Sequence, residues 1–149
     1  DVFCALGTTM ARAGSRSAFE QVDHGMVLAL AKAARQAGAR QFVLVSAAGS
    51  SATSPSFYSR TKARVESDLR ALGYPGLHIL RPSLLLGDRR ESRPMEQLAQ
   101  RLSPALGWLA RGPMARYAPV QAATVATAMR VIALRDQAGT HVYEAPFPA

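Results

Sequence analysis

The stretch Gln41-Phe-Val-Leu-Val-Ser46, followed shortly by Tyr58-Ser-Arg-Thr-Lys62, decides the fold that this sequence predicts. The run from Val43 to Val45 is apolar and rich in β-branched residues, which is typical of a buried parallel strand. Residues 47–55 are small and turn-forming, so they predict a loop. From Tyr58 onward, apolar residues recur at intervals of three or four, which indicates a helix that ends near Gly73.

Ser46, Tyr58 and Lys62 are predicted to meet where a ligand binds. Tyr58 and Lys62 lie one helical turn apart, and a parallel α/β sheet forms its ligand crevice where strands end and helices begin. A phenol titrates near pH 10, and a neighbouring ammonium lowers that pKa toward neutrality. A serine hydroxyl can hold a carbonyl or alcohol oxygen beside the phenol. The trio therefore suits proton transfer at that oxygen while a hydride moves at carbon.

A chance pairing is the simpler alternative, in which Tyr58 and Lys62 form an exposed helix pair. Lysine occurs at two positions, 32 and 62, among 18 basic residues. With four tyrosines, a lysine at a fixed offset of four arises by chance in roughly one such chain in twenty. Because a strand ending in Ser46 lies just upstream, the functional interpretation is favoured.

This trio and two later stretches, Leu80-Arg-Pro-Ser-Leu-Leu-Leu-Gly87 and Asp88-Arg-Arg-Glu-Ser-Arg-Pro94, resemble the short-chain dehydrogenase/reductase superfamily. The similarity is to its atypical NAD(P)H-binding branch, which contains the Tat-interacting oxidoreductase-like protein, and covers nearly the whole chain. It implies an NAD(P)-dependent oxidoreductase acting on a carbonyl/alcohol pair, with NADP(H) favoured over NAD(H). Tyr58 would be the general acid/base, Lys62 would lower its pKa and hold the ribose, and Ser46 would orient the substrate oxygen.

The same resemblance implies cofactor contacts from two further loops. Besides Tyr58 and Lys62, the expected cofactor-binding residues are Leu6, Gly7, Thr8, Pro82, Ser83 and Leu84. The eleven glycines, however, form no G-x-G-x-x-G or G-x-x-G-x-x-G spacing, so these 149 residues lack the loop that grips a pyrophosphate. We therefore expect residues 1–149 to be one domain, the carboxyl-terminal two-thirds of an NAD(P)-binding Rossmann-like domain. Its first strands would be missing, and a further segment or another chain should cover the strand Val2 to Leu6.

Alternating strand and helix patterns predict an α/β fold, a parallel sheet with helices on both faces. Strands are expected at 1–6, 41–46, 77–81 and 141–144. Helices are expected at 19–37, 58–72, 95–102 and 121–134, with a loop-rich cap over 103–119. The buried stripe of the first helix is expected to be Phe19, Val22, Met26, Leu30, Ala33 and Ala37. This stripe leaves Asp23 and His24 on the solvated face.

Arg89 and Arg93 are candidate substrate contacts, because guanidinium groups bind carboxylates and phosphates bidentately. An ion pair of Glu91 with a neighbouring arginine, which would fix the loop to the fold, is an equal alternative. The histidines lie at positions 24, 78 and 141. None has the spacing of a metal site, so no metal is expected.

Composition narrows the partners and the compartment. The single cysteine, Cys4, excludes an internal disulfide and fits a reducing environment, so we expect a cytoplasmic protein. No apolar run approaches the roughly 18 residues of a membrane span. The net charge of +8 is compatible with an anionic partner, but no dense basic run with interleaved aromatics occurs. We expect a small-molecule carbonyl substrate, no nucleic acid and no membrane, and leave a homodimer open.

Two other functions fit the same fold. One is a noncatalytic regulator that senses NAD(P)H or binds a protein, because a fold alone does not fix a function. The trio argues against it, since a sensor has no need of a tuned phenol. The other is a sugar-nucleotide epimerase, for which the short carboxyl-terminal part leaves little room.

Overall fold

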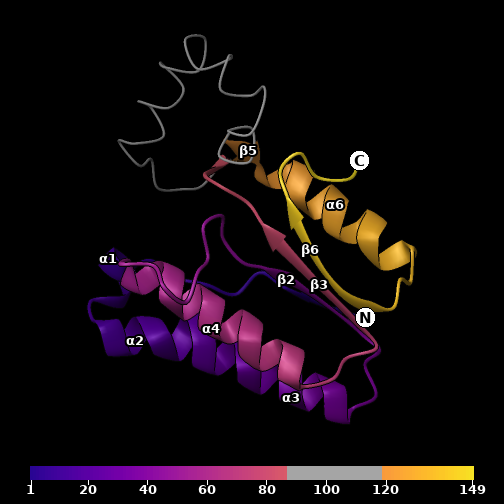
Figure 1. Ribbon diagram of the computed structural model, residues 1–149, viewed down its shortest axis with the longest axis horizontal. Helices are drawn as coiled ribbons and strands as arrows, with labels where there is room; N and C mark the ends of the chain where they lie inside the picture. The colour runs from indigo at the N-terminus through magenta and orange to yellow at the C-terminus, as the bar shows by residue number, and fades with distance from the viewer. Residues whose placement is uncertain (87–118) are drawn as a thin grey trace.

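The computed structural model describes residues 1–86 and 119–149, which form layers of helices around a parallel sheet (Figure 1). The elements are β1 (Val2–Cys4), α1 (Met10–Ala13), α2 (Arg16–Glu20), η1 (Gln21–Met26), α3 (Val27–Gln36), β2 (Gln41–Val45), α4 (Phe57–Ala71), β3 (Gly76–Arg81), β4 (Leu85–Leu86), β5 (Val120–Gln121), α6 (Ala122–Leu134) and β6 (Gly139–Glu144). The four-stranded sheet has the order β1-β2-β3-β6 with every pairing parallel. A short second sheet pairs β4 with β5. The predicted parallel α/β sheet is confirmed.

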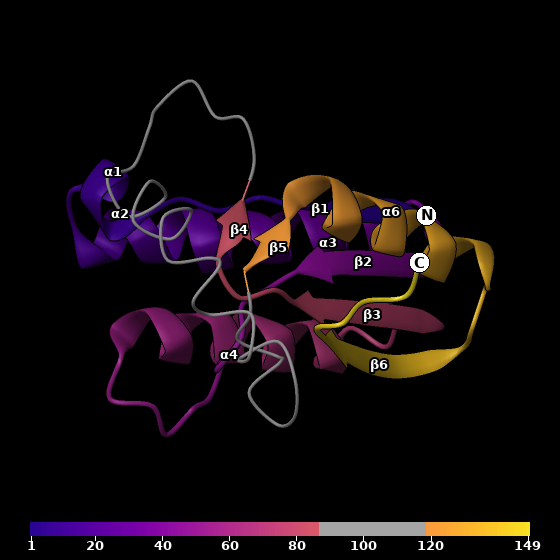
Figure 2. The same ribbon diagram turned by 90° about the horizontal axis from the view of Figure 1, so that it is seen from above.

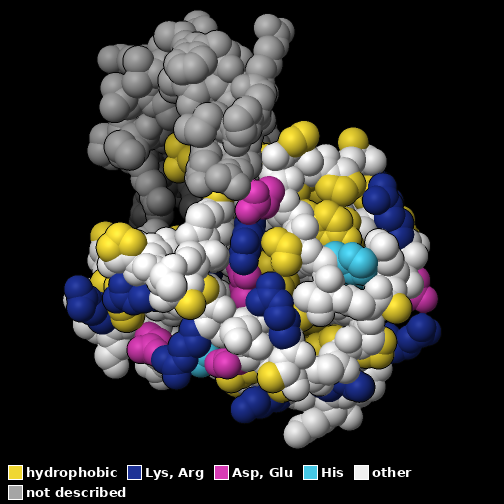
Figure 3. All heavy atoms as spheres, viewed as in Figure 1, with side chains coloured by type: hydrophobic (Ala, Val, Ile, Leu, Met, Phe, Trp, Pro, Cys, Tyr) yellow, Lys and Arg dark blue, Asp and Glu magenta, His cyan; other side chains and the backbone are white. Residues whose placement is uncertain are grey.

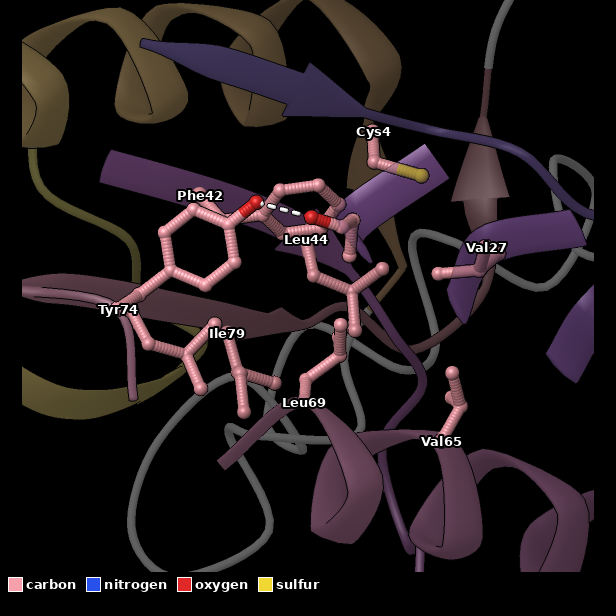
Figure 4. Packing of buried hydrophobic residues seen from close by; sticks show 10 residues of the cluster. Cys4, Val27, Phe42, Leu44, Val65, Leu69, Tyr74 and Ile79 are labelled. Atoms are coloured by element: carbon pink, nitrogen blue, oxygen red, sulfur yellow. Dashed lines mark hydrogen bonds between the residues drawn. The ribbon is translucent and has the colours of Figure 1, made fainter. Parts of the chain in front are cut away.

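The sheet is covered on both faces, with α3 and α4 on one side and α6 on the other (Figures 1 and 2). Phe42 and Leu44 of β2 pack toward α3 and α4 in the core cluster drawn in Figure 4. Val43, between them in sequence, packs toward α6. Because successive strand residues point to opposite faces, a strand buried on both faces must be apolar throughout. This is why the run from 42 to 45 carries no polar residue.

β1 lies at one end of the four-stranded sheet. Cys4 is buried in the core, as predicted, but Phe3 is 50% exposed and Leu6 is 43% exposed. In the described part of the chain β1 pairs with β2 alone. The expectation that a further segment or another chain covers this strand stays a prediction.

The first long helix buries a different stripe from the predicted one. Its middle is a π-helix, η1, rather than a continuous α-helix. The buried residues are Phe19, Asp23, Val27 and Ala31, four residues apart, whereas Met26 is 53% exposed. A π-turn holds more residues than the 3.6 of an α-helix, so the inward face advances by four or more positions per turn. The prediction of Asp23 as a solvated residue is therefore wrong.

The other predictions of helices and strands fall into two groups. α6 and β6 lie where the sequence predicted them, within two residues at each end. The predicted helix at 95–102 and nearly all of the predicted cap lie outside the described residues. Among the described helices, none has the length and apolar character needed to cross a membrane.

His78 is a buried imidazole on the α6 side of β3. It is fully buried, its ring stacks on that of His141 at 5.3 Å, and its Nδ1 lies 3.2 Å from the Tyr143 hydroxyl. Burial, and next the neighbouring His141, lower the pKa of His78 below its ordinary value of about 6.5. The folded protein therefore holds this group neutral at a pH where the unfolded chain protonates it.

We expect the free energy of unfolding to fall as pH drops below about 6.5, because the unfolded chain then takes up a proton that folded His78 does not. The loss should continue until the pH reaches the lowered pKa of the folded state. The variant His78→Leu should lose less stability than the parent chain between pH 7.5 and pH 5.5, measured by urea denaturation. Equal losses in both proteins would show that His78 does not contribute.

Candidate active site

A pocket of about 390 Å³ lies at the carboxyl ends of β1, β2 and β3. Its size is within the range of small-molecule sites. The strand register explains why the pocket forms here. Cys4 pairs with Leu44 and Leu44 pairs with Ile79, so the three strands end side by side. The lining residues are Ala5, Leu6, Gly7, Thr8, Thr9, Met10, Arg12, Asp23, Val45, Ser46, Ala47, Tyr58, Lys62, Pro82, Ser83, Leu84 and Leu85.

The structure brings the predicted trio together around this pocket. Tyr58 and Lys62 occupy the first two turns of α4, and the Lys62 ammonium lies 5.9 Å from the centroid of the Tyr58 ring. Local contacts fix where α4 starts. The Ser56 hydroxyl caps its first turn, and the Arg60 guanidinium donates to the carbonyls of Ser54 and Pro55, at 2.8 Å each.

The residues predicted from the family resemblance to contact a cofactor line the same pocket. They are Leu6, Gly7, Thr8, Pro82, Ser83 and Leu84, together with Tyr58 and Lys62. Backbone hydrogen bonds hold the segment that follows β2 beside the segment that follows β3. The Ser46 N–H donates to the Leu80 carbonyl at 2.7 Å, and the Ala48 N–H donates to the Pro82 carbonyl at 2.8 Å. The candidate substrate residues Arg89 and Arg93 lie outside the described residues.

Lys62 is held by a carboxylate that the sequence reading assigned to solvent. The Lys62 ammonium lies 2.7 Å from Asp23 Oδ1, and both side chains are buried, at 7% and 1% exposed. The other oxygen, Asp23 Oδ2, accepts the backbone N–H of Thr8 at 2.7 Å. Asp23 therefore connects η1 to α4 and to the loop after β1.

This pair changes the expected electrostatics of Tyr58. We predicted that Lys62 lowers the pKa of the phenol. Partial burial of the Tyr58 side chain, which is 37% exposed, and next the negative charge of Asp23, instead raise the pKa of Tyr58 above its ordinary value. The sequence prediction considered the ammonium of Lys62 but neither this partial burial nor the carboxylate that pairs with the ammonium.

Ser46 is also held by a buried carboxylate. The Ser46 hydroxyl donates to Glu66 Oε1 at 2.6 Å, and Glu66 is fully buried. Arg81 binds Glu66 through two hydrogen bonds, at 3.0 and 2.6 Å, and the hydrogen bond to Glu66 raises the pKa of Arg81. A serine hydroxyl has one proton, so in this arrangement Ser46 offers the pocket only acceptor lone pairs.

Sequence reasoning missed Asp23, Glu66 and Arg81. The four-residue spacing from Phe19 through Asp23 to Val27 was a signal for Asp23, but it fits a π-helix, which is rare. Glu66 lies between Val65 and Leu69 on the buried side of α4, so its position in the apolar stripe was a second signal. Nothing in the local sequence shows that Arg81, at the end of the next strand, faces Glu66.

On the face of the molecule in Figure 3, acidic side chains lie among more numerous basic ones. Surface ion pairs among the described residues include Arg40 with Asp136 and Arg64 with Glu20. Within residues 1–86 and 119–149, no three His, Cys, Asp or Glu side chains converge as metal ligands.

Among curated proteins, the chain is similar to fungal proteins named "Protein fmp52, mitochondrial". The protein from Emericella nidulans is 46% identical over 103 residues, which are 69% of this chain and 44% of that protein. The protein from Candida albicans is 47% identical over 88 residues, 59% of this chain and 38% of that protein. The chain thus matches less than half the length of these relatives. No family model matches it.

Solved structures show the same fold at low sequence identity. A UDP-N-acetylglucosamine 4-epimerase from Methanobrevibacter ruminantium superposes with a TM-score of 0.65 at 14% identity, over 97% of this chain and 55% of that one. The Bordetella bronchiseptica enzyme WbmG, solved with NAD and UDP, gives 0.60 at 15% identity, over 95% of this chain and 49% of that one. The chain is therefore homologous to the fmp52 proteins and has a Rossmann-like fold.

The relatives overturn the predicted compartment. We expected a cytoplasmic protein, but the homologues at about 45% identity carry the name mitochondrial. A lone cysteine excludes an internal disulfide, yet it does not distinguish one reducing compartment from another. Composition was therefore insufficient for this prediction.

Replacing Arg81 with methionine should destabilise the fold, because it leaves the Glu66 carboxylate buried with a single, longer arginine contact to Arg70, at 3.6 Å. Breaking a buried pair costs about 3 kcal/mol or more. The matched control is Arg40→Met, which removes an exposed pair with Asp136 and should cost less than about 0.5 kcal/mol. Urea denaturation compares the two variants, and equal effects would contradict a structural role for Arg81.

Proposed function

We propose that the protein is an NAD(P)-dependent oxidoreductase that acts on a carbonyl/alcohol pair through Ser46, Tyr58 and Lys62. The observation that carries the proposal is that these three side chains line one pocket with both loops expected to contact a cofactor. The Rossmann-like fold, and WbmG as a similar structure solved with NAD, add support.

The pocket fits the nicotinamide and ribose end of the cofactor. The Lys62 ammonium forms an ion pair with Asp23 Oδ1 at 2.7 Å, and an ammonium has three N–H donors, so Lys62 has donors to offer ribose hydroxyls. Gly7 leaves the approach to this ammonium open, since a Cβ there would lie 3.6 Å from Nζ. Leu6 and Leu84 supply exposed apolar surface for a ring. When bound, a nicotinamide would supply or accept the hydride.

The chain's own groups would handle the proton at the substrate oxygen. Tyr58 would donate a proton to a carbonyl oxygen, or remove one from an alcohol, as hydride transfer proceeds at the adjacent carbon. Ser46, with its proton donated to Glu66, would accept a hydrogen bond from an alcohol. To hold a carbonyl oxygen instead, the Ser46 hydroxyl would have to turn away from Glu66.

A second candidate is a noncatalytic protein that binds NAD(P)H for regulation, and specific contacts favour it. The two residues proposed to act with Tyr58 already have partners within the protein, Asp23 for Lys62 and Glu66 for Ser46. The raised pKa of Tyr58 makes proton release at neutral pH harder. These contacts permit the binding of NAD(P)H, but they make catalysis by Tyr58 less favourable than we expected from the sequence alone.

Calorimetric titration with NADPH and NADH tests the cofactor first. We also propose that these residues form the carboxyl-terminal two-thirds of an NAD(P)-binding domain. The match accounts for less than half the length of the fmp52 relatives, so those proteins contain further residues outside it, which supports the proposal. The 149-residue chain should therefore bind NADPH weakly, and a longer natural form with a glycine-rich loop should bind it tightly, more so than NADH. If neither form binds either nucleotide, the cofactor proposal fails.

Replacing Tyr58 with phenylalanine tests the chemistry. Since general acid–base groups contribute about 100-fold or more, turnover of a carbonyl panel should drop by at least that factor. NADPH binding should persist, because the aromatic ring remains. The control Tyr143→Phe removes a phenol hydroxyl from the other face of the sheet and should leave turnover unchanged. An active parent and an equally active Tyr58→Phe variant would remove Tyr58 from the mechanism, and a cofactor-binding parent without turnover would favour the regulator.

A further inference from the structure

The Asp23–Lys62 pair is the most deeply buried ion pair in the described part of the chain, and it forms one wall of the pocket. Both carboxylate oxygens of Asp23 are used, Oδ1 by Lys62 and Oδ2 by the backbone of Thr8. Lys62 lies on α4, and Thr8 lies in the loop after β1. Asp23 thereby holds the loop after β1, the helix η1 and the start of α4 in one arrangement around the space that faces Tyr58.

We propose that Asp23 is a positioning residue of this site: by holding the Lys62 ammonium, it sets the charge that the Tyr58 phenol experiences. The proposal rests on the proposed function for its biological meaning. Its physical content, that Asp23 governs the ionisation of Tyr58, can be measured without any turnover. The raised pKa of Tyr58, in which Asp23 is the second cause after burial, agrees with this geometry.

The surrounding structure keeps Asp23 in this position. On η1 the Asp23 side chain lies on the buried face, between the buried residues Phe19 and Val27. Gly7 passes so close that a Cβ would lie 3.2 Å from Asp23 Oδ1. Phe19, from the turn before Asp23, packs against the Tyr58 ring with centroids 5.6 Å apart. The phenol and the carboxylate are therefore held by the same pair of helices.

The other ionisable groups near Tyr58 and Lys62 do not account for this effect. Cys4, on β1, is buried, and burial raises the pKa of its thiol, so it adds no charge at neutral pH. Arg12 lines the pocket from α1 with an exposed side chain. The remaining ionisable side chains between these helices have partners of their own, Glu20 with Arg64 and His24 with Asp68. Asp23 is the acidic side chain among the described residues that line the pocket.

A merely structural pair would have a different consequence. If Asp23 only fastened η1 to α4, its removal would lower stability and leave the ionisation of the phenol unchanged. If Asp23 offsets Lys62, its removal exposes the phenol to an uncompensated ammonium. An opposite charge at this range lowers a pKa by about one to three units.

The test is a titration of Tyr58 by NMR, with the Cζ carbon of all tyrosines labelled with ¹³C. The spectrum of Tyr58→Phe identifies the Tyr58 signal among the four tyrosines. In the parent protein, Tyr58 should titrate above pH 10. In Asp23→Asn, the midpoint should fall by about one pH unit or more. Circular dichroism at each pH confirms that the protein stays folded.

Further variants complete the test. Glu20→Gln removes a carboxylate that binds Arg64 between the same helices, away from the pocket, and should leave the Tyr58 midpoint unchanged. The double variant Asp23→Asn/Lys62→Met removes both charges together, so its midpoint should lie close to that of the parent. If Asp23→Asn does not fold, Lys62→Met decides the matter: the phenol would then face the Asp23 carboxylate without its ammonium, so the Tyr58 midpoint should rise, and an unchanged midpoint would overturn the proposal.

An unchanged midpoint in Asp23→Asn would overturn the proposal. So would a rise of about one unit or more in the double variant, since Lys62 would then act on the phenol despite Asp23. These outcomes are independent of catalysis. A protein without turnover that shows the expected shift would contradict the proposed function and support the role of Asp23.

Discussion

The pocket depends on the in-register parallel pairing of β1, β2 and β3. Because Cys4, Leu44 and Ile79 lie side by side across the sheet, the residues that follow each strand emerge at the same edge. This places Leu6, Ser46 and Pro82, which are far apart in the sequence, around one space. Antiparallel pairing of any one strand would send its following loop to the opposite edge, and the pocket would lose that wall.

Two buried carboxylates then fix the polar side chains within that space. Asp23 holds Lys62, and Glu66 holds Ser46 while Arg81 balances its charge. A buried charge is tolerated only when it is paired, so each carboxylate needs its partner. The result is a site whose functional groups are already oriented, but whose hydrogen-bonding capacity is partly used within the protein. A ligand can use only the hydrogen-bond donors and acceptors that these contacts leave free.

The sequence predicted the sheet because its central strands, β2 and β3, are buried on both faces and are rich in apolar residues. The resemblance to the short-chain dehydrogenase/reductase superfamily implied two further loops beside the trio, and residues of both loops line the pocket. The partners of those residues could not be predicted. The buried stripe of the first long helix runs through Asp23 and Val27, whereas a stripe of 3.6 spacing through Val22 and Met26 fitted the sequence equally well. The Glu66–Arg81 pair links a helix to a strand, and no local pattern encodes such a contact.

The π-turn also has a consequence for how this sequence can change. A helix with a π-turn contains one residue more than the α-helix that would span the same distance, so a single deletion within 21–26 would remove it. After such a deletion Phe19 and Val27 would be seven residues apart, and seven α-helical steps of about 100° return to nearly the same face of the helix. Phe19, Val27 and Ala31 could therefore all stay in the core. A single deletion within the π-turn should accordingly be better tolerated than a single deletion within α3, where it would turn the flanking residues by about 100° relative to each other.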